Sequence, residues 1–134
     1  SGRVIAEDIH PDFMSNIEAK IKSAGWSNVT PVHGGERNPN LPEGQVDLVF
    51  ILDTYHHFDY PGEMLGHIAR SMKPDARLAI VDFYRRGQRD GGEDMSKHVR
   101  ADKPEVIKEI EANGWQLLSQ QDHSDQYVLI FRKK

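Results

Sequence analysis

Strand-like and helix-like segments alternate along this chain of 134 residues. Short apolar runs rich in branched residues are typical of strands, whereas apolar residues three or four positions apart indicate helices. Strands are expected at residues 4–9, 28–33, 46–52, 77–83, 115–121 and 127–132, and helices at residues 12–24, 61–72 and 104–113. This alternation predicts an α/β fold with a doubly wound, mostly parallel sheet that ends in an antiparallel hairpin.

Two of these strands are expected in the interior of the sheet. Residues 46–52 (VDLVFIL) form the strongest strand pattern, and a nearly continuous apolar run is typical of burial on both faces. Residues 4–9 are short, apolar and β-branched, which favours the same environment. Pro74 prevents the second helix from continuing, so residues 73–76 are expected to form a turn. The charged segment 85–103 contains Gly91-Gly92 and is expected to be a mobile surface connection.

Composition limits the function classes open to the chain. The net charge is −4 and the isoelectric point is about 5.9, so there is no electrostatic reason to expect nucleic acid or an acidic membrane surface as a partner. The absence of cysteine excludes disulfides, thiolate metal sites and cysteine nucleophiles. No apolar run is long enough to span a bilayer. We expect residues 1–134 to be one domain in the cytoplasm, although an upstream export signal would change that location.

Asp8 is the first candidate for a functional residue, because it closes the first strand directly before a helix. In nucleotide-binding α/β units, an acid at this place accepts hydrogen bonds from ribose hydroxyls, and a glycine-rich turn lies about 20 residues upstream. Glu7 is adjacent and could share that role. The alternative is a simple helix N-terminal acid, which is favourable in any fold. Only Ser1 and Gly2 precede the strand here, so we expect the glycine-rich turn to be missing.

The segment Asp53–Phe58 (DTYHHF) follows the strongest strand and carries the second group of candidates. Histidine titrates near neutral pH and could remove a proton from an oxygen or nitrogen nucleophile. The two histidines, Asp53 and Asp59 also suggest a metal site. However, adjacent residues on an extended segment point apart, and no third ligand has a useful spacing, so no metal is expected. A structural role at the strand–helix junction is the other interpretation.

Four segments in fixed order resemble the class I S-adenosylmethionine-dependent methyltransferase family. They are Asp8 after its strand, LPEGQVDLV at 41–49, DTYHHF at 53–58 and RSMKPDARL at 70–78. The closing helix, the Asn-Gly-Trp turn and the final hairpin are similar to that family as well. The resemblance implies a Rossmann-like fold, truncated because the first strand, first helix and glycine-rich motif are absent. It also implies S-adenosylmethionine as cofactor and a methyl acceptor of unknown identity, expected to be a small molecule.

The resemblance also assigns site residues. It implies cofactor-binding residues at Asp8, Ile9, Glu36 and Asp53, and catalytic residues at His56 and Tyr55. Glu36 would meet the adenine amino group, but the family's usual Gly-Asp pair is not reproduced there, and a solvated turn is the alternative. Asp82 ends the next strand, and capping a loop is its simplest role.

The missing glycine-rich loop has two expected consequences. The loop anchors the methionine half of the cofactor in this family, so the chain alone is expected to bind S-adenosylmethionine poorly or not at all. Two apolar strand edges are also left without a partner, which favours either direct pairing of residues 4–9 with 46–52 or a homodimer.

Three other functions remain open. The chain could be a non-catalytic, dimeric binding or scaffold module, or one half of a split methyltransferase. An NAD-dependent reductase would share the ribose acid, but the 53–58 segment and the hairpin fit a methyltransferase better.

Overall fold

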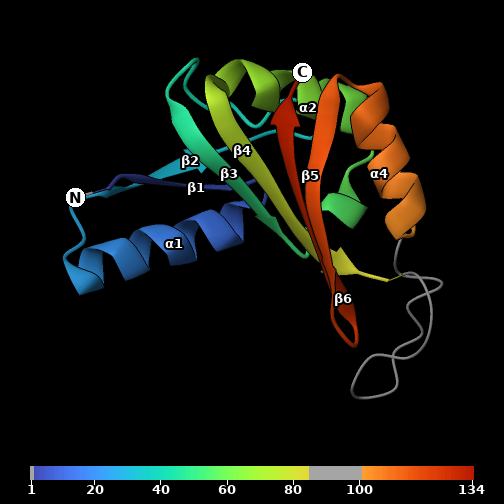
Figure 1. Ribbon diagram of the computed structural model, residues 1–134. Coiled ribbons are helices and arrows are strands. Elements are labelled where there is room, and N and C mark those ends of the chain that lie inside the picture. The colour runs from blue at the N-terminus through green and yellow to red at the C-terminus, as the bar shows by residue number, and fades with distance from the viewer. Residues whose placement is uncertain (1, 85–100) are drawn as a thin grey trace.

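The computed structural model describes residues 2–84 and 101–134, and in these ranges the strands form two separate sheets (Figure 1). The strands are β1 (Val4–Asp8), β2 (Val29–His33), β3 (Val46–Leu52), β4 (Met72–Phe83), β5 (Trp115–Asp122) and β6 (Gln126–Lys133). The helices are α1 (Pro11–Ala24), the single 3₁₀ turn η1 (Tyr55–His57), α2 (Pro61–Ser71) and α4 (Lys103–Ala112). Most predicted boundaries are correct to within one residue. The connection predicted at 85–103 lies almost entirely outside the described residues.

The pairing of the strands confirms the predicted fold class. β1 and β2 are parallel, and so are β3 and β4. β6 lies between β4 and β5 and is antiparallel to both, which gives the order β3-β4-β6-β5. The fold is therefore Rossmann-like, with parallel strands first and an antiparallel hairpin at the carboxyl end.

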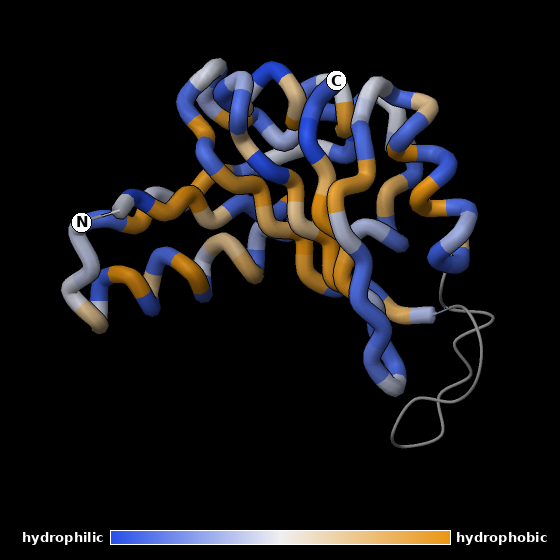
Figure 2. The backbone as a smooth tube through the Cα atoms, in the orientation of Figure 1, coloured by the Kyte–Doolittle hydropathy of each residue, from blue (hydrophilic) through white to orange (hydrophobic). Residues whose placement is uncertain are grey.

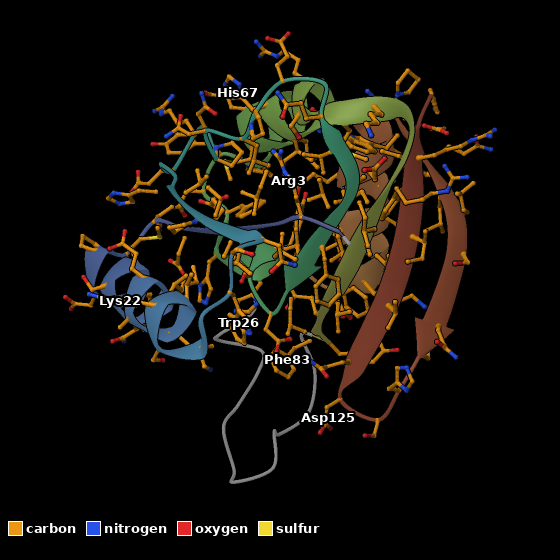
Figure 3. The ribbon with its side chains drawn as sticks, turned by 90° about the vertical axis from the view of Figure 1, so that its left-hand side faces the viewer. Arg3, Lys22, Trp26, His67, Phe83 and Asp125 are labelled. Carbon is orange, nitrogen blue, oxygen red and sulfur yellow. The ribbon has the colours of Figure 1, made fainter. Side chains whose placement is uncertain are left out.

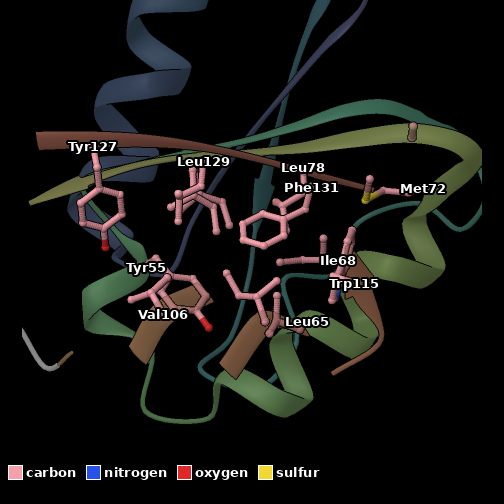
Figure 4. Packing of buried hydrophobic residues seen from close by; sticks show 14 of the residues in the cluster. Tyr55, Leu65, Ile68, Met72, Leu78, Val106, Trp115, Tyr127, Leu129 and Phe131 are labelled. Atoms are coloured by element: carbon pink, nitrogen blue, oxygen red, sulfur yellow. The ribbon is translucent and has the colours of Figure 1, made fainter. Parts of the chain in front are cut away.

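Helices α2 and α4 cover one face of the four-stranded sheet, and the main core lies between these helices and the sheet (Figures 1 and 4). Leu65 and Ile68 of α2 and Val106 and Ile110 of α4 are three or four positions apart, so each pair faces the sheet from one side of its helix. They pack against inward-facing side chains such as Phe131 of β6. None of the described helices is long and apolar enough to cross a membrane.

The opposite face of β3 is open to solvent, so the prediction that residues 46–52 are buried on both faces is wrong. Leu48, Phe50 and Leu52 are 56%, 58% and 50% exposed, respectively, and share one face because alternate residues of a strand point the same way. The neighbouring Ile51 points into the core and is buried. Figure 2 shows how apolar residues dominate this strand and its neighbours. In the described parts of the chain, nothing packs over the three exposed side chains closely enough to bury them.

The first strand is also less buried than the sequence predicts. Both ends of the predicted segment 4–9, Val4 and Ile9, are exposed, and the residues between them are only half-buried. Helix α1 packs on this strand and on β2, to one side of the larger sheet (Figure 1). Within the described residues, β1 pairs with β2 alone, so the expected direct pairing with residues 46–52 does not occur.

The turn predicted at residues 73–76 is instead the irregular beginning of β4. The strand starts at Met72, immediately after α2, and its register with β3 shifts between the pairs Val46–Met72 and Leu48–Arg77. Met72 and Ala76 are both buried in the core, which holds this stretch extended. The ammonium of Lys133 donates to the carbonyls of Ala69 and Met72, each at 2.9 Å, and satisfies the end of α2 without a compact turn.

The loop that follows β2 contacts the beginning of α2, the helix that comes after β3. The guanidinium of Arg37 donates to Glu63 at 2.9 Å and lies 3.7 Å from the centre of the Tyr60 ring. Both partners belong to the start of α2, the helix that follows β3. The carboxyl ends of β2 and β3 therefore lie on the same side of the molecule.

Candidate functional site

A buried histidine–aspartate pair lies where the parallel strands β3 and β4 end. His56 belongs to η1, just beyond β3, and Asp82 is near the end of β4. Figure 3 labels Phe83, the last residue of β4. The register pairs Leu52 with Val81, so the two ends meet. His56 Nδ1 lies 2.6 Å from Asp82 Oδ1, and the two side chains are only 2% and 1% exposed. Ligands bind at this edge of open parallel sheets.

The Asp82 carboxylate holds more than the histidine ring. Its Oδ2 accepts the backbone N–H of His56 at 2.9 Å, and its Oδ1 also accepts the backbone N–H of Phe83 at 2.8 Å. Two backbone N–H donors and the imidazole thus converge on one buried acid, as a carboxylate removed from water requires. The sequence suggested only a capping role for Asp82, and the carboxylate does cap the segment, but it also fixes the imidazole.

Tyr55, the other predicted catalytic residue, points into the core. Its ring is fully buried among the core side chains, and its hydroxyl donates to Glu109 of α4 at 2.5 Å (Figure 4). His56, its neighbour, is directed instead to Asp82. The structure therefore separates these two predicted residues, with Tyr55 packed beneath α4 and His56 at the end of β4.

Asp53 makes the sharp change of direction between β3 and η1. Its φ of 51° lies in the left-handed region, which aspartate tolerates better than most residues and which is found preferentially at functional sites. Its backbone N–H donates to Val81 at 2.8 Å, and its carboxylate accepts the side-chain amide of Gln126 at 2.5 Å. Gln126 was not predicted, because nothing local relates two residues so far apart in the sequence.

Asp8 occupies the expected place at the end of β1 and is half-buried. Its Oδ1 accepts the backbone N–H of His10 at 3.1 Å, so it also begins the turn into α1. The carbonyl of Ile9 lies 2.9 Å from His33 Nε2, which joins the ends of β1 and β2. Glu36 is exposed in the loop that follows β2. This arrangement agrees both with a ribose-binding acid and with a simple helix N-terminal acid.

Glu7 points away from Asp8, because successive side chains of a strand alternate. Burial, together with the smaller effect of the nearby charge of Asp8, raises the pKa of its carboxyl from 4.5 to about 7, and His33 partly opposes the change. Its Oε1 is buried and has no hydrogen-bond partner among the described residues. The carboxyl occupies the space above Gly34, where a Cβ would lie only 2.0 Å from that oxygen.

The side chains present fit the nucleoside half of S-adenosylmethionine and not its methionine half. Asp8 offers a carboxylate at the end of a parallel strand, which is what two ribose hydroxyls require. No glycine-rich loop follows β1 or β3 in the described residues, so no cradle of backbone N–H groups is present there for the methionine half.

Two other possible sites give little support to an alternative. An open hollow of about 300 Å³ lies between the 38–43 loop and the second half of α2, near His67 and Arg70, at the opposite end of β3 from His56. Across residues 2–84 and 101–134, no three His, Asp or Glu side chains are grouped closely enough to hold a metal ion.

Comparison with known proteins decides the family. A family model described as a methyltransferase domain matches residues 1–78, which is more than half of the chain. The chain belongs to this methyltransferase-domain family. No curated protein is significantly similar to it in sequence.

Solved structures agree with this family. A S-adenosylmethionine-dependent methyltransferase from Aquifex aeolicus is 25% identical, with a TM-score of 0.89 over 99% of this chain and 70% of that one. A methyltransferase-like protein from Bacillus halodurans, described only as a candidate enzyme, is 16% identical, with a TM-score of 0.75 over 98% of this chain and 82% of that one, and shows the fold alone. The [4+2]-cyclase SpnF is 12% identical, with a TM-score of 0.83 over 98% of this chain and 67% of that one, and shows the fold alone.

Proposed function

We propose that this chain is the acceptor-side portion of a S-adenosylmethionine-dependent methyltransferase that acts on a small molecule. The observation that carries the proposal is the family match over residues 1–78, which includes β1 with Asp8 and all of β3 with the His56 segment. The fold by itself would be insufficient, because one fold serves many activities.

The proposal gives each candidate residue a role. Asp8 accepts the ribose hydroxyls, Ile9 packs beside the nucleoside, and Glu36 accepts the adenine amino group. Asp53 shapes the pocket floor where the chain leaves β3. S-adenosylmethionine, when bound, supplies an electrophilic methyl group and takes the electron pair of the breaking carbon–sulfur bond.

His56 is the proposed general base for the acceptor's oxygen or nitrogen. Proton removal by a positioned side chain contributes about 10²- to 10⁴-fold to such a rate. Tyr55 has a supporting role in the proposal, because its hydroxyl is directed to Glu109 and its ring to the core.

We further propose that these 134 residues alone bind S-adenosylmethionine weakly or not at all. Asp8 can hold the nucleoside, but half of the cofactor has no anchor among the described residues. Calorimetric titration with S-adenosylmethionine is expected to show no saturable heat below the millimolar range. Micromolar affinity in the unaltered chain that Asp8→Asn abolishes would overturn this proposal and would support a complete cofactor site.

A second proposal concerns the open face of β3. Leu48, Phe50 and Leu52 are large, apolar and exposed on one face of β3, and an exposed apolar patch of this kind is typical of a surface that contacts another protein chain. We propose that a second copy of the chain covers this face and that the protein is a homodimer.

Light scattering at high concentration tests the homodimer. The unaltered chain is expected to have twice the monomer mass, and Phe50→Asp is expected to have the monomer mass. Leu118→Asp is the matched control, because Leu118 is 41% exposed on β5, at the opposite edge of the sheet from β3, and should leave the dimer intact. A monomer at high concentration would contradict the proposal.

The dimer would also serve a non-catalytic binding or scaffold module, and the open strand edges would equally suit one half of a split methyltransferase. Adding a separate chain with a glycine-rich strand–helix unit distinguishes these functions. Restored methyl transfer supports a split enzyme, whereas a stable dimer that remains inactive with every addition supports a scaffold.

A further inference from the structure

In the contact between His56 and Asp82, the other hydrogen bonds of Asp82 indicate which group donates the hydrogen. Both oxygens of Asp82 already accept backbone N–H groups, from His56 and from Phe83. With an N–H donor directed at each of its oxygens, the carboxyl group is arranged as an acceptor on both sides. The third contact, from His56 Nδ1 at 2.6 Å, must therefore have the ring nitrogen as its donor.

This direction fixes the state of the histidine ring. A neutral imidazole carries one N–H and one lone pair, so a proton held on Nδ1 leaves the lone pair on Nε2. We infer that Asp82 is a positioning residue that holds His56 in the Nδ1–H tautomer and makes Nε2 its basic atom. The inference rests on the proposed function only for what that atom does, not for the tautomer itself.

In the proposed reaction, this arrangement gives the proton a defined destination. The O–H or N–H bond of the acceptor breaks, its proton forms a bond to Nε2, and its electron pair stays on the acceptor atom, which becomes the nucleophile. The ring is then an imidazolium, and the Asp82 carboxylate next to Nδ1 stabilises that charge. The same division of labour, with one group as base and a buried acid that orients it, is effective in other enzymes.

The fold supplies the rigidity that such a pair needs. Asp82 is on β4, which has hydrogen-bonded neighbours on both sides, and it holds the backbone of His56 as well as the ring. The His57 ring lies 4.0 Å from the His56 ring, and the Phe83 ring lies 6.3 Å from it with its edge turned toward it. Aromatic rings on two sides thus restrict rotation of the imidazole.

Nitrogen NMR of the labelled chain tests the inference without cofactor or acceptor. The chain has seven histidines, so His56→Gln first identifies the His56 signals by their loss. The unaltered protein is expected to show His56 with hydrogen on Nδ1 and the lone pair on Nε2. A lone pair on Nδ1 instead would overturn the inference.

Two substitutions test whether Asp82 is the cause. Asp82→Asn is expected to lose the single tautomer, because the amide can offer an N–H to Nδ1. His10→Gln is the control, because His10 is exposed just before α1, and it should leave the His56 tautomer unchanged. Retention of the Nδ1–H form in a folded Asp82→Asn protein would contradict a positioning role. These experiments measure no methyl transfer. A negative NMR result would therefore contradict the tautomer but not the proposed methyltransferase function, and absence of methyl transfer would not contradict the tautomer.

Discussion

The four-stranded sheet and the β1–α1–β2 unit contain similar patterns of apolar residues but bury them to different extents. Every member of the main core cluster lies between Ile51 and Phe131, in the larger sheet and the segments that cover it. Among the described residues of the smaller unit, Met14 is the one large apolar side chain that is buried. The larger sheet is covered by α2 and α4, whereas β1 and β2 have α1 alone. In these two units, the burial of a strand therefore follows the number of helices that cover it more closely than the apolar pattern of its own sequence.

The two tryptophans of the chain allow this difference to be measured. Trp115 is 1% exposed in the core of the larger sheet, and Trp26 is 49% exposed immediately after α1. Fluorescence of Trp26→Phe and Trp115→Phe proteins therefore reports the two regions separately. We expect the smaller unit to unfold at the lower urea concentration.

Removing a side chain from the core should have the largest effect. Leu65→Ala leaves a cavity between α2 and the sheet and should lower the free energy of unfolding by about 3 kcal/mol. Urea unfolding followed by Trp115 fluorescence measures the loss. Phe13→Ala is the matched change in the smaller unit, and because Phe13 is 54% exposed it should cost less than about 1 kcal/mol. Equal losses would show that the two regions are packed alike.

Gly34→Ala should have an intermediate effect that is confined to the smaller unit. The new Cβ would lie 2.0 Å from Glu7 Oε1 and 3.1 Å from the Pro39 backbone, so the Glu7 carboxyl must leave its buried position and the Pro39 backbone must move slightly. We expect a loss of about 1–3 kcal/mol in the unfolding followed by Trp26. In a Glu7→Ser background most of this loss should disappear. The same loss in both backgrounds would place the clash elsewhere.

Glu7 should also make the smaller unit sensitive to pH. Because burial raises the pKa of Glu7 from 4.5 to about 7, the folded unit binds a proton that the unfolded chain releases. The resulting stability is fully present below pH 4.5 and is lost as the pH rises to about 7. Glu7→Gln should remove that decline in the urea midpoint reported by Trp26, while the Trp115 midpoint changes little. A decline that persists in Glu7→Gln would assign it to another group.

Arg37→Ala should have the smallest effect, although Arg37 joins the two regions. The Arg37–Glu63 pair is exposed on both sides, and exposed ion pairs contribute about 0–1 kcal/mol. We expect an equally small change from Lys73→Ala, which breaks the exposed Asp47–Lys73 pair within the larger sheet. A clearly larger effect of Arg37→Ala on the Trp26 midpoint would mean that this contact holds the smaller unit in place.

Local pattern was sufficient to predict most of the fold. The apolar spacing of Leu65 and Ile68 identifies α2, and the helix ends at Ser71, before Pro74. The exposed face of β3 could not be predicted, because the sequence of a strand does not state what covers it. The turn at 73–76 was wrong because burial of Met72 and Ala76, together with the distant Lys133, replaces it with an extended stretch.

The candidate site was predictable in part. His56 and Asp53 follow the strongest strand, and that position alone identified them. The link from His56 to Asp82 depends on the register of β3 and β4, and the link from Asp53 to Gln126 depends on the antiparallel partner of β4. The sequence did nevertheless contain a signal for Asp82. This acid lies near the end of a predicted strand, and the ends of adjacent parallel strands lie side by side, so Asp82 could have been expected near the residues that follow β3.

The position of β6 between β4 and β5 has a consequence for synthesis. β6 follows every other described strand in the chain, yet it is the strand that joins β5 to the rest of the larger sheet. While a ribosome is still making residues 126–133, β4 has an open side and Trp115 lacks the sheet that covers it. The larger sheet must therefore complete its core late, after β6 has emerged. Until then its apolar side chains stay exposed to solvent, where they can aggregate with other chains.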